Sequence, residues 1–240
     1  MRATEVAELA GLGWAGSGTR AGVSDGGDWW PEADWAAEAG GSPDGQDSGR
    51  ARRRGRGGTQ LGRAVHASLQ AIGIEAARRI AGGETPGAEL RQLAEAQARA
   101  EGIGGRTHEV EALVAAALSS RTVKAAFASG RPRREVYVAT TVGEVVLDGY
   151  VDLCFEDGDG LTVVDYKTDT VRDHAEVEES AERYSLQAAA YALALGDATG
   201  LPVRRCVLVF LSPPGRPIEF EVSDLSTVVE RVRSVVQAAA

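Results

Sequence analysis

The chain has 240 residues, enough for one large domain, and its 43% hydrophobic and 25% charged residues are typical of a globular protein. Its formal net charge of −9 argues against a general polyanion binder but does not exclude a metal-dependent enzyme that acts on nucleic acid. No apolar run is long enough to span a membrane, no secretory signal opens the chain, and two cysteines exclude a four-cysteine iron–sulfur or zinc site, so we expect a cytoplasmic protein.

The first 58 residues predict a flexible N-terminal segment (residues 1–58), because they are rich in Gly, Ser and Asp and show no sustained period. Two features stand out in this segment. One is a tryptophan cluster: Trp29, Trp30 and Trp35. Docking of these rings onto a partner, docking onto the domain and loose packing in a linker all stay open.

The other feature is a basic run in an otherwise acidic chain. Its arginines are Arg52, Arg53, Arg54 and Arg56. Guanidinium groups bind phosphate with little sequence preference, so these side chains are candidate DNA phosphate contacts. The alternative is a linker that the charges only keep solvated.

From residue 59 the pattern predicts one folded domain (residues 59–240). Helical spacing predicts helices over 59–72, 87–101 and 106–119 and a short one over 121–129. Alternation predicts a meander of strands over 134–141, 144–155 and 161–168. A long helix over 173–196, with Asp169 and Asp173 at its start, precedes strands in VRRCVLVFLS and PIEFEVS and a helix over 224–239. This order predicts a mixed α/β fold with one central sheet.

Charged side chains gather at the end of the third strand, in VVDYKTDTV. Asp165 and Lys167 are two residues apart and so leave the same face of the strand, while Tyr166 points the other way. Asp152 on the preceding strand is expected to lie across the hairpin from this pair. Gly149 would let another group approach the backbone closely.

Two carboxylates and an ammonium suit phosphodiester hydrolysis. Carboxylate oxygens are the ligands that Mg²⁺ and Mn²⁺ prefer, and a lysine beside such a site can orient water and stabilise developing negative charge. The alternative for Asp165 and Lys167 is a salt bridge without a catalytic role.

Four sequence motifs occur in the order of a known family: GRAVHASLQ, GYVDL, DYKT and QAAAY. With them, roughly residues 59–240 resemble the RecB-like branch of the PD-(D/E)XK nuclease superfamily. Within that branch, the chain resembles the C-terminal nuclease domain of UvrD/RecB-type bacterial helicases. The resemblance implies a restriction-endonuclease-like fold: a central mixed sheet flanked by helices, with a helical N-terminal subregion.

The resemblance also implies site roles. Asp152 and Asp165 would be catalytic carboxylates and ligands of Mg²⁺ or Mn²⁺, with His66 and the backbone carbonyl of Tyr166 as further ligands. Lys167 would be the catalytic lysine.

Four more residues are implied to support the site or the DNA. Gln187 and Tyr191 are four apart and share a helix face with Tyr184, which would abut the active site or the DNA strand. Glu135 resembles an acidic residue that some family members place before the meander.

The resulting hypothesis is a metal-dependent DNA exonuclease or endonuclease of repair and recombination, with an exonuclease on single strands favoured. The resemblance implies that hydrolysis leaves a 5′-phosphate. No Walker A motif is present, so we expect neither bound nucleotide nor an ATP-driven motor in this chain. Either the protein works alone, or it is the tail of a split helicase and needs a motor partner. The alternative class is a non-catalytic DNA-binding or scaffold module of a helicase–nuclease complex.

Overall fold

A computed structural model describes residues 1–3, 5–6, 59–171, 174–211 and 217–239. These ranges contain one mixed sheet in the order β1-β2-β3-β4-β5. The strands are β1 (Arg133–Val142), β2 (Val145–Asp157), β3 (Gly160–Lys167), β4 (Val203–Phe210) and β5 (Ile218–Glu221). The first three form the expected antiparallel meander, β3 pairs with β4 in parallel, and β5 returns antiparallel to β4.

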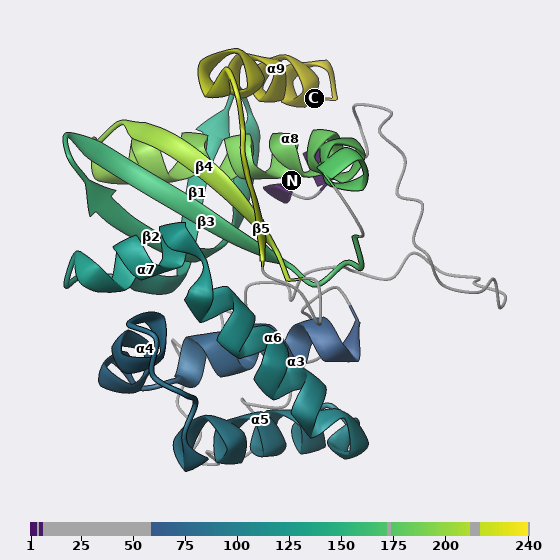
Figure 1. The fold of residues 1–240 in the computed structure, drawn as a ribbon. Helices are drawn as coiled ribbons and strands as arrows, with labels where there is room; N and C mark the ends of the chain where they lie inside the picture. The colour runs from purple at the N-terminus through teal and green to yellow at the C-terminus, as the bar shows by residue number, and fades with distance from the viewer. Residues whose placement is uncertain (4, 7–58, 172–173, 212–216, 240) are drawn as a thin grey trace, which may run out of the picture.

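Helices cover both faces of this sheet (Figure 1). One face carries α3 (Gln60–Ala71), α4 (Ile74–Ala81), α5 (Ala88–Ala100), α6 (Thr107–Ser119) and α7 (Arg121–Ala128), with a 3-10 turn, η2 (Gly104–Arg106), between α5 and α6. The other face carries α8 (His174–Thr199) and α9 (Leu225–Ala238). Because parallel strands need a crossover, α8 connects β3 to β4. The architecture confirms the predicted α/β fold with a helical N-terminal subregion.

The hydrophobic core has two parts, one on each face of the sheet. The α8 side holds Val163 of β3, and the α3–α7 side holds its neighbour Val164. Every residue of β3 is buried, in line with Leu161, Val163 and Val164 before Asp165. Among the described residues, no helix is long and apolar enough to span a membrane.

Two parts of the chain depart from the expected element list. Helix α4 was not predicted, because its eight residues follow α3 after only Ile72 and Gly73 and give a short apolar period. At the start of the chain, Ala3 and Val6 are buried in the α8-side core.

The rest of the N-terminal segment lies outside the described residues, so the boundary at residue 58 stays a prediction. The features that fall there are Trp29, Trp30 and Trp35 and the arginines Arg52, Arg53, Arg54 and Arg56.

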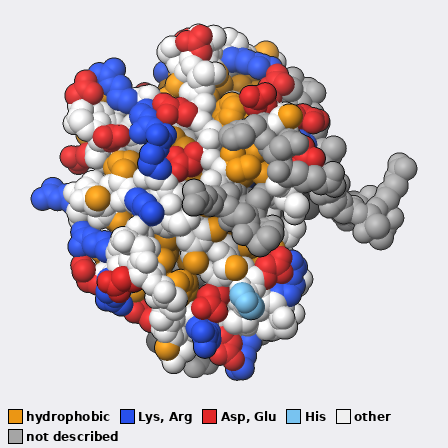
Figure 2. Space-filling view, viewed as in Figure 1, with side chains coloured by type: hydrophobic (Ala, Val, Ile, Leu, Met, Phe, Trp, Pro, Cys, Tyr) orange, Lys and Arg blue, Asp and Glu red, His pale blue; other side chains and the backbone are white. Residues whose placement is uncertain are grey.

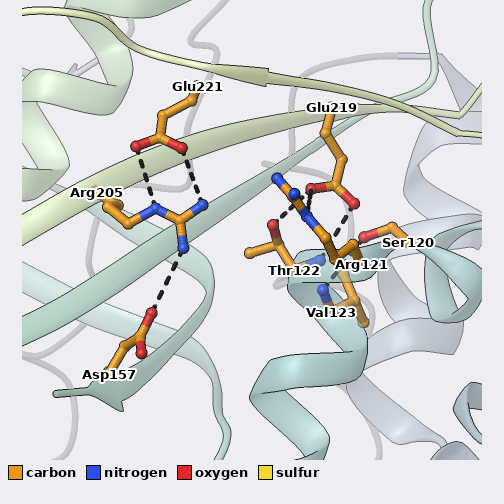
Figure 3. Close-up of polar contacts among 8 residues, drawn as sticks. All are labelled: Ser120, Arg121, Thr122, Val123, Asp157, Arg205, Glu219 and Glu221. Carbon is orange, nitrogen blue, oxygen red and sulfur yellow. Dashed lines mark hydrogen bonds and ion pairs between the residues drawn. The ribbon is translucent and has the colours of Figure 1, made fainter.

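Two glutamates on β5, Glu219 and Glu221, bind different partners (Figure 3). Glu219 reaches the start of α7, where its carboxylate accepts hydrogen bonds from the backbone N–H of Thr122 at 3.2 Å and from its hydroxyl at 2.6 Å. Glu221 forms a two-point ion pair with Arg205, at 3.1 and 2.9 Å, on a more exposed part of the strand. Glu219 therefore connects α7 to β5, the edge strand of the sheet.

The two glutamates form a matched pair for a stability test. Glu219→Ala is expected to lower the free energy of unfolding in urea by about 1–2 kcal/mol, because the start of α7 loses a cap and the buried Thr122 hydroxyl loses its acceptor. Glu221→Ala should cost less than about 1 kcal/mol, as exposed ion pairs do. Equal losses would contradict the capping role.

The loss at Glu219 should also depend on pH. Burial raises the pKa of Glu219, but the bonds from Thr122 and the charge of Arg121 outweigh burial and lower it below its ordinary 4.5. A depressed folded-state pKa stabilises the fold above the unfolded-state pKa, and this stability is lost as the pH falls through the folded-state value. The difference between the two variants should therefore shrink in acid.

Candidate active site

Asp165 and Lys167 leave β3 on the α8 face, as strand alternation predicts, and both are nearly buried, at 5% and 9% exposed. Lys167 Nζ lies 2.5 Å from Asp165 Oδ2 and donates a hydrogen bond to Gln187 Oε1 at 2.9 Å. The same ammonium sits 3.9 Å from the centre of the Tyr184 ring. The lysine is thus held by an anion, an amide and an aromatic face.

Gln187, which accepts the hydrogen bond from Lys167, is itself fixed by Tyr191 on the same helix, α8. Gln187 donates from Nε2 to the Tyr191 hydroxyl at 2.9 Å, and both side chains are buried. The Tyr191 ring lies against Gly149 of β2, where an added Cβ would meet Tyr191 Cε1 at 2.7 Å. The close approach expected at Gly149 is therefore made by the Tyr191 ring.

The other half of the site lies between α3 and the meander. Asp152 Oδ1 is 3.0 Å from His66 Nδ1, and Asp152 Oδ2 accepts the backbone N–H of Tyr166 at 2.8 Å. His66, Glu135 and Asp152 each offer one ligand atom, and these atoms lie within 4.8 Å of one another. The structure thus brings Glu135 into a group that could hold a metal ion.

A local reversal of the strands produces this group. Val136 of β1 packs in the α8-side core, whereas Arg134, two residues earlier, bonds to carbonyls of α3 and its C-cap. On β2, Val151 and Leu153 lie in opposite cores. Residues two apart on a regular strand share a face, so alternation reverses on both strands between these positions.

The reversal falls at Glu135 on β1 and at Asp152 on β2. The flanking residues keep their pairing, but Glu135 has a φ of 52°, in the left-handed region. A non-glycine residue there is strained, and such strain clusters at functional sites.

A glycine brings α3 close to the sheet. Gly62 faces Thr168, just beyond β3, and an added Cβ would meet Thr168 Oγ1 at 2.9 Å. His66 follows four residues later, on the same helix face. At the other end of the helix, Arg134 donates to the carbonyls of Leu69 and Ile72 at 3.0 and 2.6 Å. The helix that carries His66 is therefore fixed at both ends.

The charges of the site shift its pKa values in opposite directions. Burial lowers the pKa of His66, but the charge and hydrogen bond of Asp152 outweigh it, with help from Glu135 and Asp165, and raise it to about 9. Burial raises the pKa of Asp152, yet His66, the Tyr166 amide and Lys167 bring it below its usual value. For Asp165, burial and the nearby Asp152 charge outweigh Lys167 and raise the pKa.

The residues present fit a divalent cation. Asp165 Oδ2 is buried and lies 2.5 Å from the ammonium of Lys167, with no other partner among the described residues. A carboxylate oxygen can accept more than one partner, so Asp165 can bind a metal ion in addition to the ammonium. Carboxylates with one imidazole also form a donor set that suits Mg²⁺ or Mn²⁺.

Comparison with known proteins gives the family. A family model described as the PD-(D/E)XK nuclease superfamily matches residues 43–240. The chain belongs to the PD-(D/E)XK nuclease superfamily. The match confirms the family that the four motifs indicate, and the mixed sheet between two helical layers agrees with the fold expected of such a nuclease.

Curated relatives of this PD-(D/E)XK nuclease are much longer proteins. It is 43% identical over 60 residues to an ATP-dependent helicase/nuclease subunit from Thermoanaerobacter sp. (strain X514), covering 25% of this chain and 5% of that one. The protein of the same name from Acetivibrio thermocellus is 42% identical over 76 residues, covering 32% and 6%. The matched segment is thus about one twentieth of each relative.

A solved structure, that of SSO0001, aligns over 75% of this chain and 84% of that chain. Its TM-score is 0.36 and its sequence identity 15%, so the similarity supports no inference about this chain.

Sequence reasoning missed two residues around the site of this PD-(D/E)XK nuclease. Arg134 anchors α3, and only the fold could reveal that, since its acceptors lie more than 60 residues away. Asp169, expected at the start of the next helix, instead accepts a hydrogen bond from the Tyr184 hydroxyl at 2.9 Å. Its position two residues after Lys167 was the available signal.

Proposed function

We propose that this chain is a Mg²⁺- or Mn²⁺-dependent deoxyribonuclease of DNA repair and recombination that acts as an exonuclease on single strands. One observation carries the proposal: two sets of groups meet at the end of β3. The first is the His66, Glu135 and Asp152 group. The second is the Asp165–Lys167 pair, and the bond from the Tyr166 amide to Asp152 joins the two.

The ion would be held by the His66, Glu135 and Asp152 group, with Asp165, which lies outside that group, as a further ligand. The Tyr166 carbonyl is a further candidate, because the carbonyl and N–H of a strand residue leave on the same side, and that N–H already points to Asp152. When bound, the ion supplies Lewis-acid polarisation of the phosphate and a more acidic water.

Lys167 would position the attacking water next to the scissile phosphate. An ammonium has three donors, and Gln187 accepts one of them. Asp165 Oδ2 lies 2.5 Å from the same nitrogen, and the ammonium proton that is left can orient the attacking water and stabilise negative charge on the scissile phosphate. Water adds to phosphorus and loses a proton to solvent, while the 3′-oxygen leaves and takes up a proton, so the products carry a 5′-phosphate and a 3′-hydroxyl. Gln187, Tyr191 and Tyr184 keep the lysine in place for this step.

DNA affinity in this proposal comes from local contacts. The net charge of the chain is −9, and acidic and basic side chains are interspersed on the face shown in Figure 2. Cations from the basic run 52–56 would add phosphate contacts, and with them a steep loss of affinity at higher salt.

A helicase motor is the partner we propose, because the matched relatives are named as helicase/nuclease proteins. In this arrangement residues 59–240 are the nuclease domain, residues 1–58 are mainly a linker, and the motor supplies single strands in the cytoplasm. No observation favours the scaffold module over catalysis, and the next experiment separates the two.

Metal removal tests the proposed function. End-labelled single-stranded DNA should be cut in Mg²⁺ or Mn²⁺ and left intact in EDTA, with double-stranded DNA of the same sequence cut more slowly. The measurement is a gel assay over a metal titration, with circular dichroism to show that the protein is folded. Tight DNA binding in EDTA without cutting in either metal would instead support the scaffold module.

A further inference from the structure

The first residues of the chain dock where the sheet has a gap. The β2–β3 ladder covers only Leu153–Asp157 of β2, so the earlier half of β2 has no β3 neighbour. Arg2 forms a parallel bridge to Asp148 in this gap, and the Asp148 N–H donates to the carbonyl of Met1 at 3.1 Å. We name residues 1–3 and 5–6 the docking segment.

Two residues of the docking segment are part of the hydrophobic core. Ala3 is 1% exposed and Val6 is fully buried, and both belong to the α8-side core. Arg2 and Glu5 close the segment with reciprocal bonds: Arg2 N–H donates to the Glu5 carboxylate at 2.9 Å, and Glu5 N–H donates to the Arg2 carbonyl at 3.0 Å. The segment lies outside the family match, which begins at residue 43.

Ala3 of the docking segment and the Tyr191 ring both lie next to Gly149 of β2. A Cβ added to Gly149 would lie 3.6 Å from the Ala3 Cβ and 2.7 Å from the Tyr191 ring. Ala3 and Tyr191 therefore close around the same stretch of β2. From there hydrogen bonds lead from the Tyr191 hydroxyl to Gln187 and from Gln187 to the Lys167 ammonium.

We propose that the docking segment positions Lys167, by fixing the Tyr191 ring against Gly149 and so fixing Gln187. Ala3 and Val6 are then positioning residues, although they touch neither metal nor DNA. The inference rests on the proposed function for its catalytic consequence, but not for its structural one.

The lysine content of the chain offers a direct readout. The sequence contains two lysines, Lys124 and Lys167. Lysine-selective isotope labelling of the full chain therefore gives two side-chain signals in an NMR spectrum. Lys167 lies over the Tyr184 ring and should show a ring-current shift, whereas Lys124 is exposed on α7 and serves as internal reference.

The test compares two identical truncations. Val6→Ala removes buried methyl groups from the docking segment, and Val114→Ala removes them from the fully buried Val114 of α6, in the other core. Without metal, Val6→Ala should shift the Lys167 signal, and Val114→Ala should leave it in place. Gly149→Ala, which pushes on Tyr191 from β2, should shift the same signal as Val6→Ala.

Cleavage kinetics give the functional arm. Val6→Ala should lower kcat about tenfold at unchanged KM and unchanged Mn²⁺ affinity, because misplacing a catalytic group costs rate rather than binding. In a Tyr191→Phe background, which lacks the bond to Gln187, Val6→Ala should cause no further loss.

The outcomes separate the two ideas. An unmoved Lys167 signal in Val6→Ala, or equal effects of Val6→Ala and Val114→Ala, would overturn the positioning role. If the wild type cuts no DNA under any metal, the proposed function fails, and the NMR comparison still decides what the docking segment does.

Discussion

Asp152→Asn is expected to remove Mn²⁺ binding and to lower DNA cleavage by about 10³-fold or more. Asp152 joins His66 to the end of β3 through both carboxylate oxygens, and its loss takes the central anion from the ligand group. A bound ion contributes several kcal/mol to stabilising the transition state, and about 4 kcal/mol corresponds to a factor of 10³. Isothermal titration calorimetry measures Mn²⁺ binding, and a gel assay measures DNA cleavage separately.

Asp148→Asn is the matched control for this substitution. Asp148 is a carboxylate on the same strand, but it accepts a hydrogen bond from the Tyr137 hydroxyl at 3.3 Å and belongs to no ligand group found among the described residues. Its replacement should leave Mn²⁺ affinity and rate within about twofold, as surface substitutions do. Retained Mn²⁺ binding in Asp152→Asn would show that the ion sits elsewhere.

Lys167→Ala is expected to lower cleavage by about 10²–10³-fold with Mn²⁺ binding retained, the cost typical of losing one donor to a developing negative charge. The ammonium is fixed by Asp165, Gln187 and Tyr184, so another cation cannot easily take its place. The loss should appear in kcat, since the contact is made in the transition state.

Lys124→Ala controls for the loss of a lysine charge, because Lys124 is exposed on α7. It should cut DNA at the wild-type rate. A Lys167→Ala protein that cuts as fast as Lys124→Ala would show that the buried lysine is a structural ion pair only.

The sequence predicted the lysine side of the site well, because local rules determine it. Alternation alone puts Asp165 and Lys167 on one face and Tyr166 on the other, and a four-residue helical spacing puts Gln187 beside Tyr191. The structure shows each of these placements. The roles of these residues stay proposals until they are tested.

The metal side depends on tertiary structure and was only partly predictable. Regular alternation cannot foresee that both strands reverse at Glu135 and Asp152, since a φ of 52° on a glutamate is imposed by its surroundings. Glu135 was expected near the site by resemblance, but its place in the ligand group comes from this reversal.

The burial of the docking segment could likewise not be predicted from the sequence. Residues 1–58 look flexible as a whole because composition is averaged over a window, and burial of Ala3 and Val6 follows only from the gap beside β2. Helix α4 was not predicted because its eight residues are too few for a helical period to be recognised.

The central claim is that the end of β3 is the catalytic part of a metal-dependent nuclease. One gel tests it most directly: wild type and Lys167→Ala, both shown to be folded, incubated with end-labelled single-stranded DNA in Mn²⁺. The wild type should cut the substrate, and the variant should leave almost all of it intact. Equal cutting by the two proteins, or an intact substrate with the wild type, would contradict it.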